Sequence, residues 1–301
     1  MPSIDLGSSP LAPGKSPVRV HYRDAGSGRP IVILHGGWGY EVYPFDRSIA
    51  ALSPSHRVIA PDRTGYGHSA RLDRQETDFH HRAAAETFAV IAALGLDRPI
   101  LWGHSDGAVI ALLMALDDPD RMSGLIVEAA HVYRRKPASR LFFETMMRDP
   151  DGLGERVTSV LAREHGDGWR DLIRTNGDAW LRIADDPAAP TADLYDGRLS
   201  TLRVPTLVIH GARDPRTEPG ELEALREAIG RTHRSAPTPV ADVGADSRVG
   251  PVRFEILAEG GHSPHSERAT ADRVTRAVHA FVSDLPDRPG LPGPSAQSTS
   301  A

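Results

Sequence analysis

The sequence predicts an α/β fold, in which a mostly parallel, doubly wound sheet carries a helical cap inserted before its last two strands. Three observations predict it. Short apolar runs alternate with helical patterns along most of the chain. The runs are apolar at nearly every position, which is typical of strands covered by helices on both faces. Between residues 131 and 199 the alternation stops, and only helical patterns remain.

The strand candidates are short runs rich in Ile, Leu and Val. They cover Ile31–Leu34, Val58–Ala60, Ile100–Trp102, Leu125–Val127, Thr206–Ile209 and Phe254–Leu257. The helical patterns between and after them cover Glu76–Leu94, Ala108–Leu116, Pro219–Ile229 and Arg268–Val282. Glycines directly after two of these patterns, Gly95 and Gly230, predict helix ends.

Composition shifts divide the chain into segments. We expect a flexible lead over residues 1–17, an α/β core over 18–130 and 200–285, a helical cap over 131–199 and a disordered tail over 286–301. The irregular stretch 231–250 predicts a surface loop. A cap at this point of the chain would cover the carboxyl edge of the sheet, where open α/β sheets bind ligands.

The bulk composition excludes several classes of protein. The 301 residues include no cysteine, so disulfides, thiolate nucleophiles and Cys-ligated zinc are absent. The net charge of −5 argues against a nucleic-acid partner. The chain shows neither an apolar run of membrane-spanning length nor a basic, apolar leader, and we expect a cytoplasmic protein without a membrane partner. The fourteen histidines form no H-E-x-x-H pattern, so we expect no metal and no cofactor.

A nucleophile is predicted at Ser105. It lies in Gly103-His104-Ser105-Asp106-Gly107, after the apolar run ILW and before the helical pattern AVIALLMAL. This is the strand–turn–helix context that a G-x-S-x-G elbow requires. The glycines are needed because side chains there would clash with the neighbouring strand and helix.

A serine hydroxyl needs a base and an acid that orients the base. His262 follows the last strand candidate in the glycine-rich Glu259-Gly-Gly-His262, and we predict it as the base, with His265 as its competitor. Asp214 follows the run TLVI and is predicted as the acid, with Glu128 as the fallback. The order Ser, Asp, His along the chain is the order found at such elbows.

An oxyanion requires two hydrogen-bond donors. One is predicted to be the backbone N–H of Asp106, the residue after the nucleophile. The other should come from His35-Gly36-Gly37-Trp38-Gly39, which follows the first strand candidate. We assign the N–H of Gly37, with that of Trp38 as the alternative.

With these motifs, residues 18–285 resemble the α/β-hydrolase superfamily. The stretch Asp62–Ser69 is similar to the D-x-x-G-x-G-x-S turn of that superfamily. Asp106 after the serine, and residues 174–180, resemble more closely the biphenyl hydrolase-like or valacyclovir hydrolase group of serine esterases. That resemblance implies amino-acid esters as substrates, with Asp106 holding the substrate ammonium. The alternative for Asp106 is a helix cap.

The predicted function is that of a serine hydrolase, which cleaves a small carboxylic ester through an acyl-enzyme. Carbon–carbon bond hydrolases, lactonases and thioesterases use the same three residues and remain alternatives, as does a non-catalytic ligand-binding relative. Epoxide hydrolases and dehalogenases are disfavoured, because their elbow nucleophile is Asp. Candidate substrate contacts are Trp38, Asp106, His131, Tyr133 and Trp180.

Overall fold

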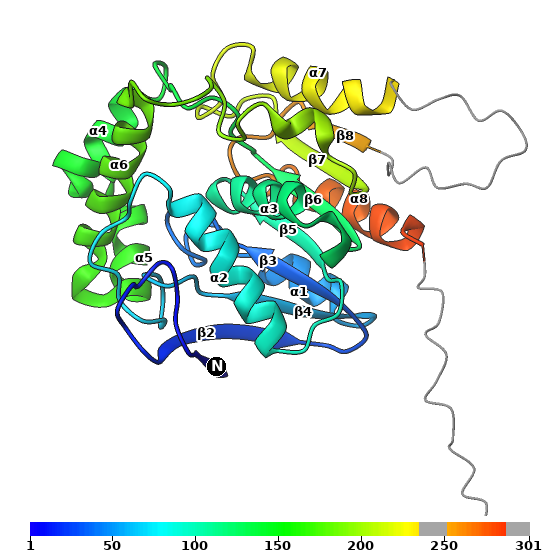
Figure 1. Ribbon diagram of the computed structural model, residues 1–301, viewed down its shortest axis with the longest axis horizontal. Helices are drawn as coiled ribbons and strands as arrows, with labels where there is room; N and C mark the ends of the chain where they lie inside the picture. Colours follow the sequence, from blue (N-terminus) through cyan, green and yellow to red (C-terminus); the bar gives the residue numbers. More distant parts are fainter. Residues whose placement is uncertain (235–251, 287–301) are drawn as a thin grey trace, which may run out of the picture.

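An eight-stranded sheet forms the centre of the molecule, in the order β1-β2-β4-β3-β5-β6-β7-β8. The computed structural model describes residues 1–234 and 252–286. β2 runs antiparallel to both β1 and β4, whereas the strands from β4 to β8 run parallel (Figure 1). The strands are β1 (Ser3–Leu6), β2 (Val18–Ala25), β3 (Arg29–Leu34), β4 (His56–Pro61), β5 (Ile100–His104), β6 (Gly124–Glu128), β7 (Thr206–Gly211) and β8 (Val252–Leu257).

The parallel strands coincide with the apolar runs of the sequence. Every residue of β5, β6 and β7 is buried, because helices cover both faces of the sheet there. This confirms the predicted fold class. The strands β1 and β2 were not predicted: in β2 the buried Val18 and Val20 alternate with less buried residues, as expected near an edge.

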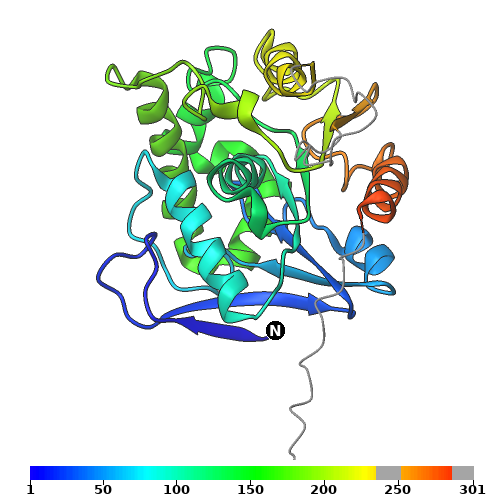
Figure 2. The same ribbon diagram turned by 45° about the vertical axis from the view of Figure 1, so that its right-hand side comes forward.

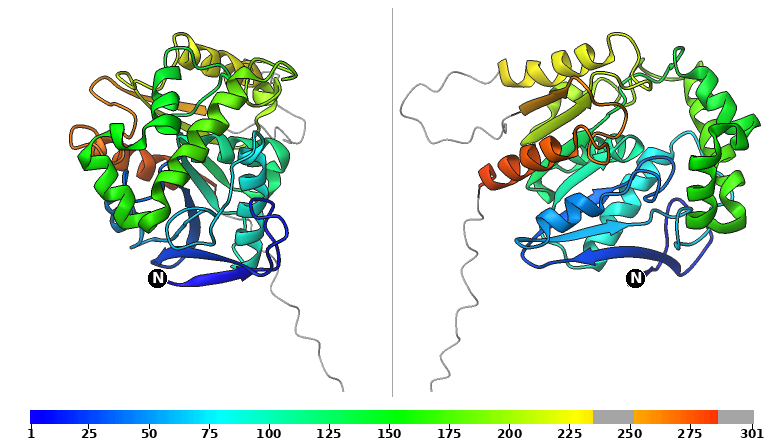
Figure 3. Two further views of the ribbon diagram at one scale, coloured as in Figure 1. Left: turned by 90° about the vertical axis from the view of Figure 1, so that its left-hand side faces the viewer. Right: turned by 180° about the vertical axis from the view of Figure 1, so that it is seen from behind.

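Helices lie on the two faces of the sheet. α2 (Phe79–Ala93), α3 (Asp106–Asp117) and α7 (Glu221–Arg234) share one hydrophobic core, in which Ile91, Leu112 and Leu225 are buried. α1 (Asp46–Leu52) and α8 (Ala271–Asp284) lie behind the sheet (Figure 3). There Leu52 and Phe281 belong to a second core. The sheet is therefore doubly wound, as predicted.

A helical insertion joins β6 to β7. It contains α4 (Arg140–Arg148), α5 (Glu155–His165) and α6 (Trp169–Asp185), which stand together at one end of the sheet (Figure 1). α6 buries one side, including Leu172, Ile173 and Trp180. Short 3-10 turns complete the described part of the chain: η1 (Pro119–Arg121), η2 (Pro150–Leu153), η3 (Gly166–Gly168) and η4 (Arg198–Thr201). We refer to α4, α5 and α6 as the cap helices.

The expected loose lead over residues 1–17 is wrong. β1 pairs with β2 (Figure 2), and the side chains of Leu6 and Leu11 are buried. The composition misleads here, because a four-residue strand is surrounded by Pro, Gly and Ser. Of the predicted loop 231–250, residues 231–234 belong to α7, and the rest lies outside the described residues. So does the predicted tail 286–301, apart from Pro286.

A helix that crosses a bilayer must be both long and apolar. None of those within residues 1–234 and 252–286 combines the length and the apolar character of a membrane-spanning segment.

Candidate active site

Ser105 occupies a strained turn between β5 and α3. Its backbone has φ of 54° and ψ of −120°, a region that a residue with a side chain rarely adopts. The turn is tight: a Cβ on Gly103 would lie 2.1 Å from the carbonyl oxygen of Gly107, and a Cβ on Gly107 would lie 2.0 Å from that of Leu34. Both glycines are thus required by close backbone approach, as the sequence indicated. The strain supports a functional role for the serine.

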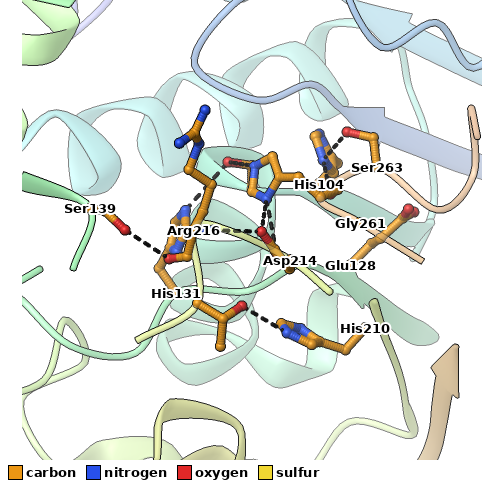
Figure 4. A network of polar contacts seen from close by, with 12 residues as sticks. His104, Glu128, His131, Ser139, His210, Asp214, Arg216, Gly261 and Ser263 are labelled. Atoms are coloured by element: carbon orange, nitrogen blue, oxygen red, sulfur yellow. Dashed lines mark hydrogen bonds and ion pairs between the residues drawn. The ribbon is translucent and has the colours of Figure 1, made fainter. Parts of the chain in front are cut away.

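Three side chains from separate loops meet at this turn. His262, after β8, places Nε2 at 3.1 Å from Ser105 Oγ. Its Nδ1 lies 2.9 Å from both carboxylate oxygens of Asp214, which follows β7. Figure 4 shows Asp214 within the network of polar contacts at this end of the sheet. The parallel strands bring these loops together because their carboxyl ends share one edge of the sheet. The structure thus brings Ser105, His262 and Asp214 into a single hydrogen-bonded chain.

Electrostatics fix the protons in this chain. Burial raises the pKa of Asp214, but the charge and hydrogen bond of His262 and the backbone N–H of Arg216 outweigh it and hold that pKa below its usual value. The carboxylate can only accept, so the Nδ1 of His262 is the donor toward it. The Nε2 of His262 then has a lone pair directed at the hydroxyl of Ser105. That is the arrangement in which an imidazole accepts a proton from serine.

The competing histidine and acid form a pair of their own. His265 Nδ1 lies 2.9 Å from Glu128 Oε1, its Nε2 lies 3.0 Å from the carbonyl oxygen of Tyr43, and both side chains are fully buried. Glu128 also accepts a hydrogen bond from Trp102 Nε1 at 3.2 Å. This second His–carboxylate pair therefore packs beneath the site and does not contact the Ser105 side chain.

Gly37 and the N-terminus of α3 face one pocket together with Ser105. Asp106 is the first residue of α3, so its N–H has no acceptor within the helix. Gly37 lies so close that a Cβ there would be 2.7 Å from Asp106 Oδ2 and 2.9 Å from Asn176 Oδ1. The predicted donor residues, Gly37 and Asp106, therefore border the nucleophile from two different loops.

The pocket above Ser105 is small, with a volume of about 40 Å³. Of the predicted substrate contacts, Trp38, Asp106, His131 and Trp180 line it. Tyr133 was the wrong choice: its hydroxyl donates to Gly220 O over 3.2 Å, and it lines a separate surface cavity. Its backbone forms an isolated antiparallel bridge with Asp193.

Asp106 carries a buried carboxylate beneath the cap helices. Its Oδ1 accepts a hydrogen bond from Trp180 Nε1 over 3.1 Å and lies 3.4 Å from His80 Nε2. Its Oδ2 accepts from Asn176 Nδ2 over 3.2 Å. The side chain is thus directed into the pocket and does not cap α3.

The charge of Asp106 is preserved despite its burial. Burial alone would raise the pKa of Asp106. The hydrogen bond from His80 and the other donors lower this pKa by more than burial raises it, so that it is about 2. Burial also lowers the pKa of His80, so that imidazole is neutral at pH 7. The groups that donate hydrogen bonds to Asp106 are therefore neutral, and the positive charge that acts on this carboxylate comes from the buried Arg63, which also lowers its pKa.

A polar contact fastens the cap helices to the loop that carries Gly37. Glu164, near the end of α5, accepts hydrogen bonds from the backbone N–H of Tyr40 at 2.7 Å and of Glu41 at 3.0 Å. The neighbouring His165 places Nε2 at 3.0 Å from Trp38 O. Burial is the main cause that raises the pKa of Glu164 to about 7. The cap helices and the loop that carries Gly37 are therefore linked through the buried side chains of Glu164 and His165.

Several pocket residues were not predicted. Arg216 lies over the ring of Phe142, with its Cζ 3.1 Å from the ring centroid, and lines the pocket. Asn176 falls in the stretch 174–180 that had been noted for its resemblance only. Lys136 is buried against His131 and Glu221. The composition already set Lys136 apart, because only Lys15 and Lys136 are lysines among the 35 basic side chains.

No metal site is found in the part of the chain that the structure describes, where no group of His, Asp and Glu has a suitable arrangement. The chemistry that these residues can perform is nucleophilic. A serine oxygen, an imidazole within hydrogen-bond distance of it and two backbone donors together suit attack on a carbonyl carbon.

Comparison with known families agrees with the fold. A model of the alpha/beta hydrolase fold matches residues 29–166. The chain has the α/β-hydrolase fold. Among curated relatives, this chain is 27% identical to the serine hydrolase BPHL of Mus musculus over 269 residues, which cover 88% of this chain and 83% of the mouse protein.

Solved α/β hydrolases share the architecture. A thermophilic esterase from Thermogutta terrifontis superposes with a TM-score of 0.66 at 21% identity, covering 94% of this chain and 98% of the esterase. A meta-cleavage product hydrolase from Pseudomonas fluorescens IP01 superposes with a TM-score of 0.63 at 22% identity, covering 92% of this chain and 97% of that hydrolase. These similarities show the common fold.

Proposed function

We propose that this protein is a serine hydrolase that cleaves a small carboxylic ester through an acyl-enzyme intermediate. The observation that carries the proposal is the hydrogen-bonded chain from Ser105 Oγ through His262 to Asp214, with its two contacts of 3.1 and 2.9 Å. The strained backbone of Ser105 and the relationship to serine hydrolases support it.

The proposed reaction has two halves. Ser105 Oγ attacks the ester carbonyl carbon while His262 takes its proton, and the N–H groups of Gly37 and Asp106 hold the oxyanion. His262 then gives the proton to the departing alcohol, which leaves Ser105 acylated. In the second half water attacks the acyl carbon, His262 accepts its proton and returns it to Oγ, and the carboxylic acid leaves. Asp214 stabilises the imidazolium in both halves.

The pocket limits the size of the acyl group. The walls formed by Phe143, Met146 and Trp180 leave little room beside Ser105, which favours a short acyl chain unless the cap helices move. We therefore propose that acetyl and propionyl esters react faster than esters of long fatty acids. This follows from shape alone, because an overfilled apolar pocket forces its walls apart.

The charge of Asp106 supports a preference within the esters. Its ionised carboxylate lines the pocket beside Ser105, and its hydrogen-bond donors are neutral. A substrate ammonium would balance this buried charge. We therefore propose that esters bearing a free α-amino group on the acyl part are preferred over their uncharged analogues.

The nucleophile is tested with p-nitrophenyl acetate. Wild-type protein should release p-nitrophenol catalytically, whereas Ser105→Ala, which removes only a hydroxyl, should retain the fold and lose the activity. The thermal unfolding curve of the variant provides the folding control. Turnover by Ser105→Ala at the wild-type rate would refute the proposed function.

The preference is tested with a pair of esters of one alcohol, alanine ester and propionate ester. Wild type should hydrolyse the alanine ester with the higher kcat/KM. Asp106→Asn keeps the shape and removes the charge, so it should lose that preference. Equal kcat/KM values for both esters in wild type would refute the amino-ester proposal and leave the serine mechanism standing.

A further inference from the structure

A second histidine faces the nucleophile. The structure assigns to His131 the role of a hydrogen-bond donor to Ser105 Oγ, in a tautomer that the buried Lys136 fixes. The inference rests on the proposed function, because it concerns the same serine. It goes beyond that function in naming a further residue at the reacting oxygen and a second residue, Lys136, that positions it.

The geometry around Ser105 Oγ involves two imidazoles. His131 follows β6, is 4% exposed, and places Nε2 at 3.4 Å from Oγ. His262 Nε2 lies 3.1 Å from the same oxygen. The two rings are nearly parallel, with centroids 5.9 Å apart and an interplanar angle of 21°. Serine has a single proton to donate, and His262 accepts it through Nε2, so a second neighbour of Oγ can hydrogen-bond to it only as a donor.

His131 is held from behind by a buried ion pair. Lys136 Nζ lies 3.0 Å from His131 Nδ1 and contacts both carboxylate oxygens of Glu221. Lys136 and Glu221 are 3% and 1% exposed. Glu221, the first residue of α7, also accepts the backbone N–H groups of Val132 at 2.6 Å and Tyr133 at 2.9 Å. A carboxyl group that accepts from all of these donors has no proton to give, so the ammonium of Lys136 fits between it and the imidazole.

The tautomer of His131 follows from this contact. An ammonium group donates hydrogen bonds and cannot accept them. Nδ1 of His131 must therefore present its lone pair to Lys136, and the single proton of the neutral ring is on Nε2, facing Ser105. In His262 the two nitrogens have the opposite roles. The carboxylate of Asp214 only accepts, so Nδ1 carries the proton and Nε2 presents its lone pair to Ser105. Burial, followed by the charge of Lys136, holds the pKa of His131 well below its usual value, so the ring stays neutral.

This donor lies where charge changes during the proposed reaction. Oγ becomes more negative as His262 takes its proton, and again when Oγ leaves the acyl carbon in the second half. An N–H group already directed at that oxygen stabilises both transition states without reorganisation. In the free enzyme the same contact holds Oγ so that its proton points at His262. His131 keeps its own proton throughout.

The tautomer is tested directly by ¹⁵N NMR of histidine-labelled protein, with the His131 signals assigned by their loss in His131→Gln. At pH 7 His131 should carry its proton on Nε2, and His262 should carry its proton on Nδ1. A proton on Nδ1 of His131, or an imidazolium there, would overturn the inference. This measurement needs no turnover, so it decides the inference even if ester hydrolysis is not observed and the proposed function fails.

Kinetics test the consequence. His131→Ala should lower kcat for p-nitrophenyl acetate by about tenfold with little change in KM, because the lost donor acts on the transition state. His131→Gln, whose amide can still donate an N–H, should recover part of that loss. A kcat for His131→Ala equal to that of wild type, in a protein that Ser105→Ala inactivates, would overturn the inference.

Lys136 is tested through His131. The double variant Lys136→Met/Glu221→Gln removes the ion pair without leaving a buried charge, and both tautomers of His131 should then be populated. Its loss of kcat should not add to that of His131→Ala, since both act on the same N–H. The matched control is Lys15→Met, at the only other lysine, which is exposed, and it should behave as wild type. Full additivity of the two losses of kcat would overturn the role of Lys136. If the double variant fails to fold, the NMR spectrum of the wild type decides, because it shows which nitrogen of His131 carries the proton.

Discussion

Trp180 Nε1 donates a hydrogen bond to Asp106 Oδ1 over 3.1 Å, and this joins the cap helix α6 to the first turn of α3. Asp106 is the neighbour of Ser105 in the chain, so the cap is attached one residue from the proposed nucleophile. Asn176, one turn earlier on α6, donates to the other oxygen of the same carboxylate. A single side chain thus contributes the pocket charge and part of the cap docking.

These two contributions can be separated with Trp180→Phe. The variant keeps an aromatic ring and loses the N–H, so the free energy of unfolding should fall by about 1 kcal/mol, measured by urea denaturation. The carboxylate remains, and the preference for the alanine ester over the propionate ester should persist. Loss of that preference to the same extent as in Asp106→Asn would contradict the role given to the charge.

Asp214 and Glu128 offer a matched pair of carboxylates. Asp214→Asn should lower kcat by about 10⁴-fold, because the amide no longer selects the Nδ1–H tautomer of His262. Glu128→Gln should leave kcat within about tenfold of wild type and lower the free energy of unfolding by about 1–3 kcal/mol, because Glu128 holds His265 and Trp102 in the core.

The two variants are compared in the same assay and the same denaturation experiment. An inactive Glu128→Gln protein with normal stability, together with an active Asp214→Asn protein, would show that Glu128 and not Asp214 is the acid of the reaction.

Gly37 should tolerate no side chain. A methyl group there would meet Asp106 Oδ2 at 2.7 Å and Asn176 Oδ1 at 2.9 Å, which displaces the loop from the oxyanion position. We expect Gly37→Ala to lower kcat by about 10²-fold in the p-nitrophenyl acetate assay. Gly7→Ala is the control, since its Cβ would contact nothing within 4 Å. Unchanged activity of Gly37→Ala would place the second oxyanion donor elsewhere.

Glu164 should make stability depend on pH. Its pKa is raised from 4.5 in the unfolded chain to about 7 in the folded protein. The folded state therefore holds the proton more tightly, so this contribution to stability is complete below pH 4.5 and is lost as the pH rises through about 7. Relative to Glu164→Gln, the wild-type free energy of unfolding should fall by about 3 kcal/mol over that interval. A constant difference between the two proteins across this range would contradict the raised pKa.

The parallel sheet could be predicted because the runs around Ile31, Leu101, Ile126 and Val208 are apolar on both faces, and the last three lie next to a clear helical period. β1 and β2 could not. Their residues alternate or lie among Pro, Gly and Ser, and only the pairing with the rest of the sheet makes them strands.

The residues of the site also fall into two groups, those that a local motif identifies and those that only the packing of the chain brings together. Ser105, Asp214 and His262 were recognisable because each lies in a motif directly after a strand, and strand ends meet at one edge. The partners of Asp106 and His131 depend on how the cap helices pack. Asn176 and Trp180 reach Asp106 from α6, and Lys136 reaches His131 from a turn, contacts that local sequence does not encode.

The most direct measurement is the site of acylation. Protein mixed with p-nitrophenyl acetate is quenched in acid during the first turnover, and its mass and peptide fragments are analysed. The account predicts one acetyl group per chain, on Ser105, and none in Ser105→Ala. An acetyl group on any other residue during turnover, or an unchanged rate without any acylated protein, would contradict it.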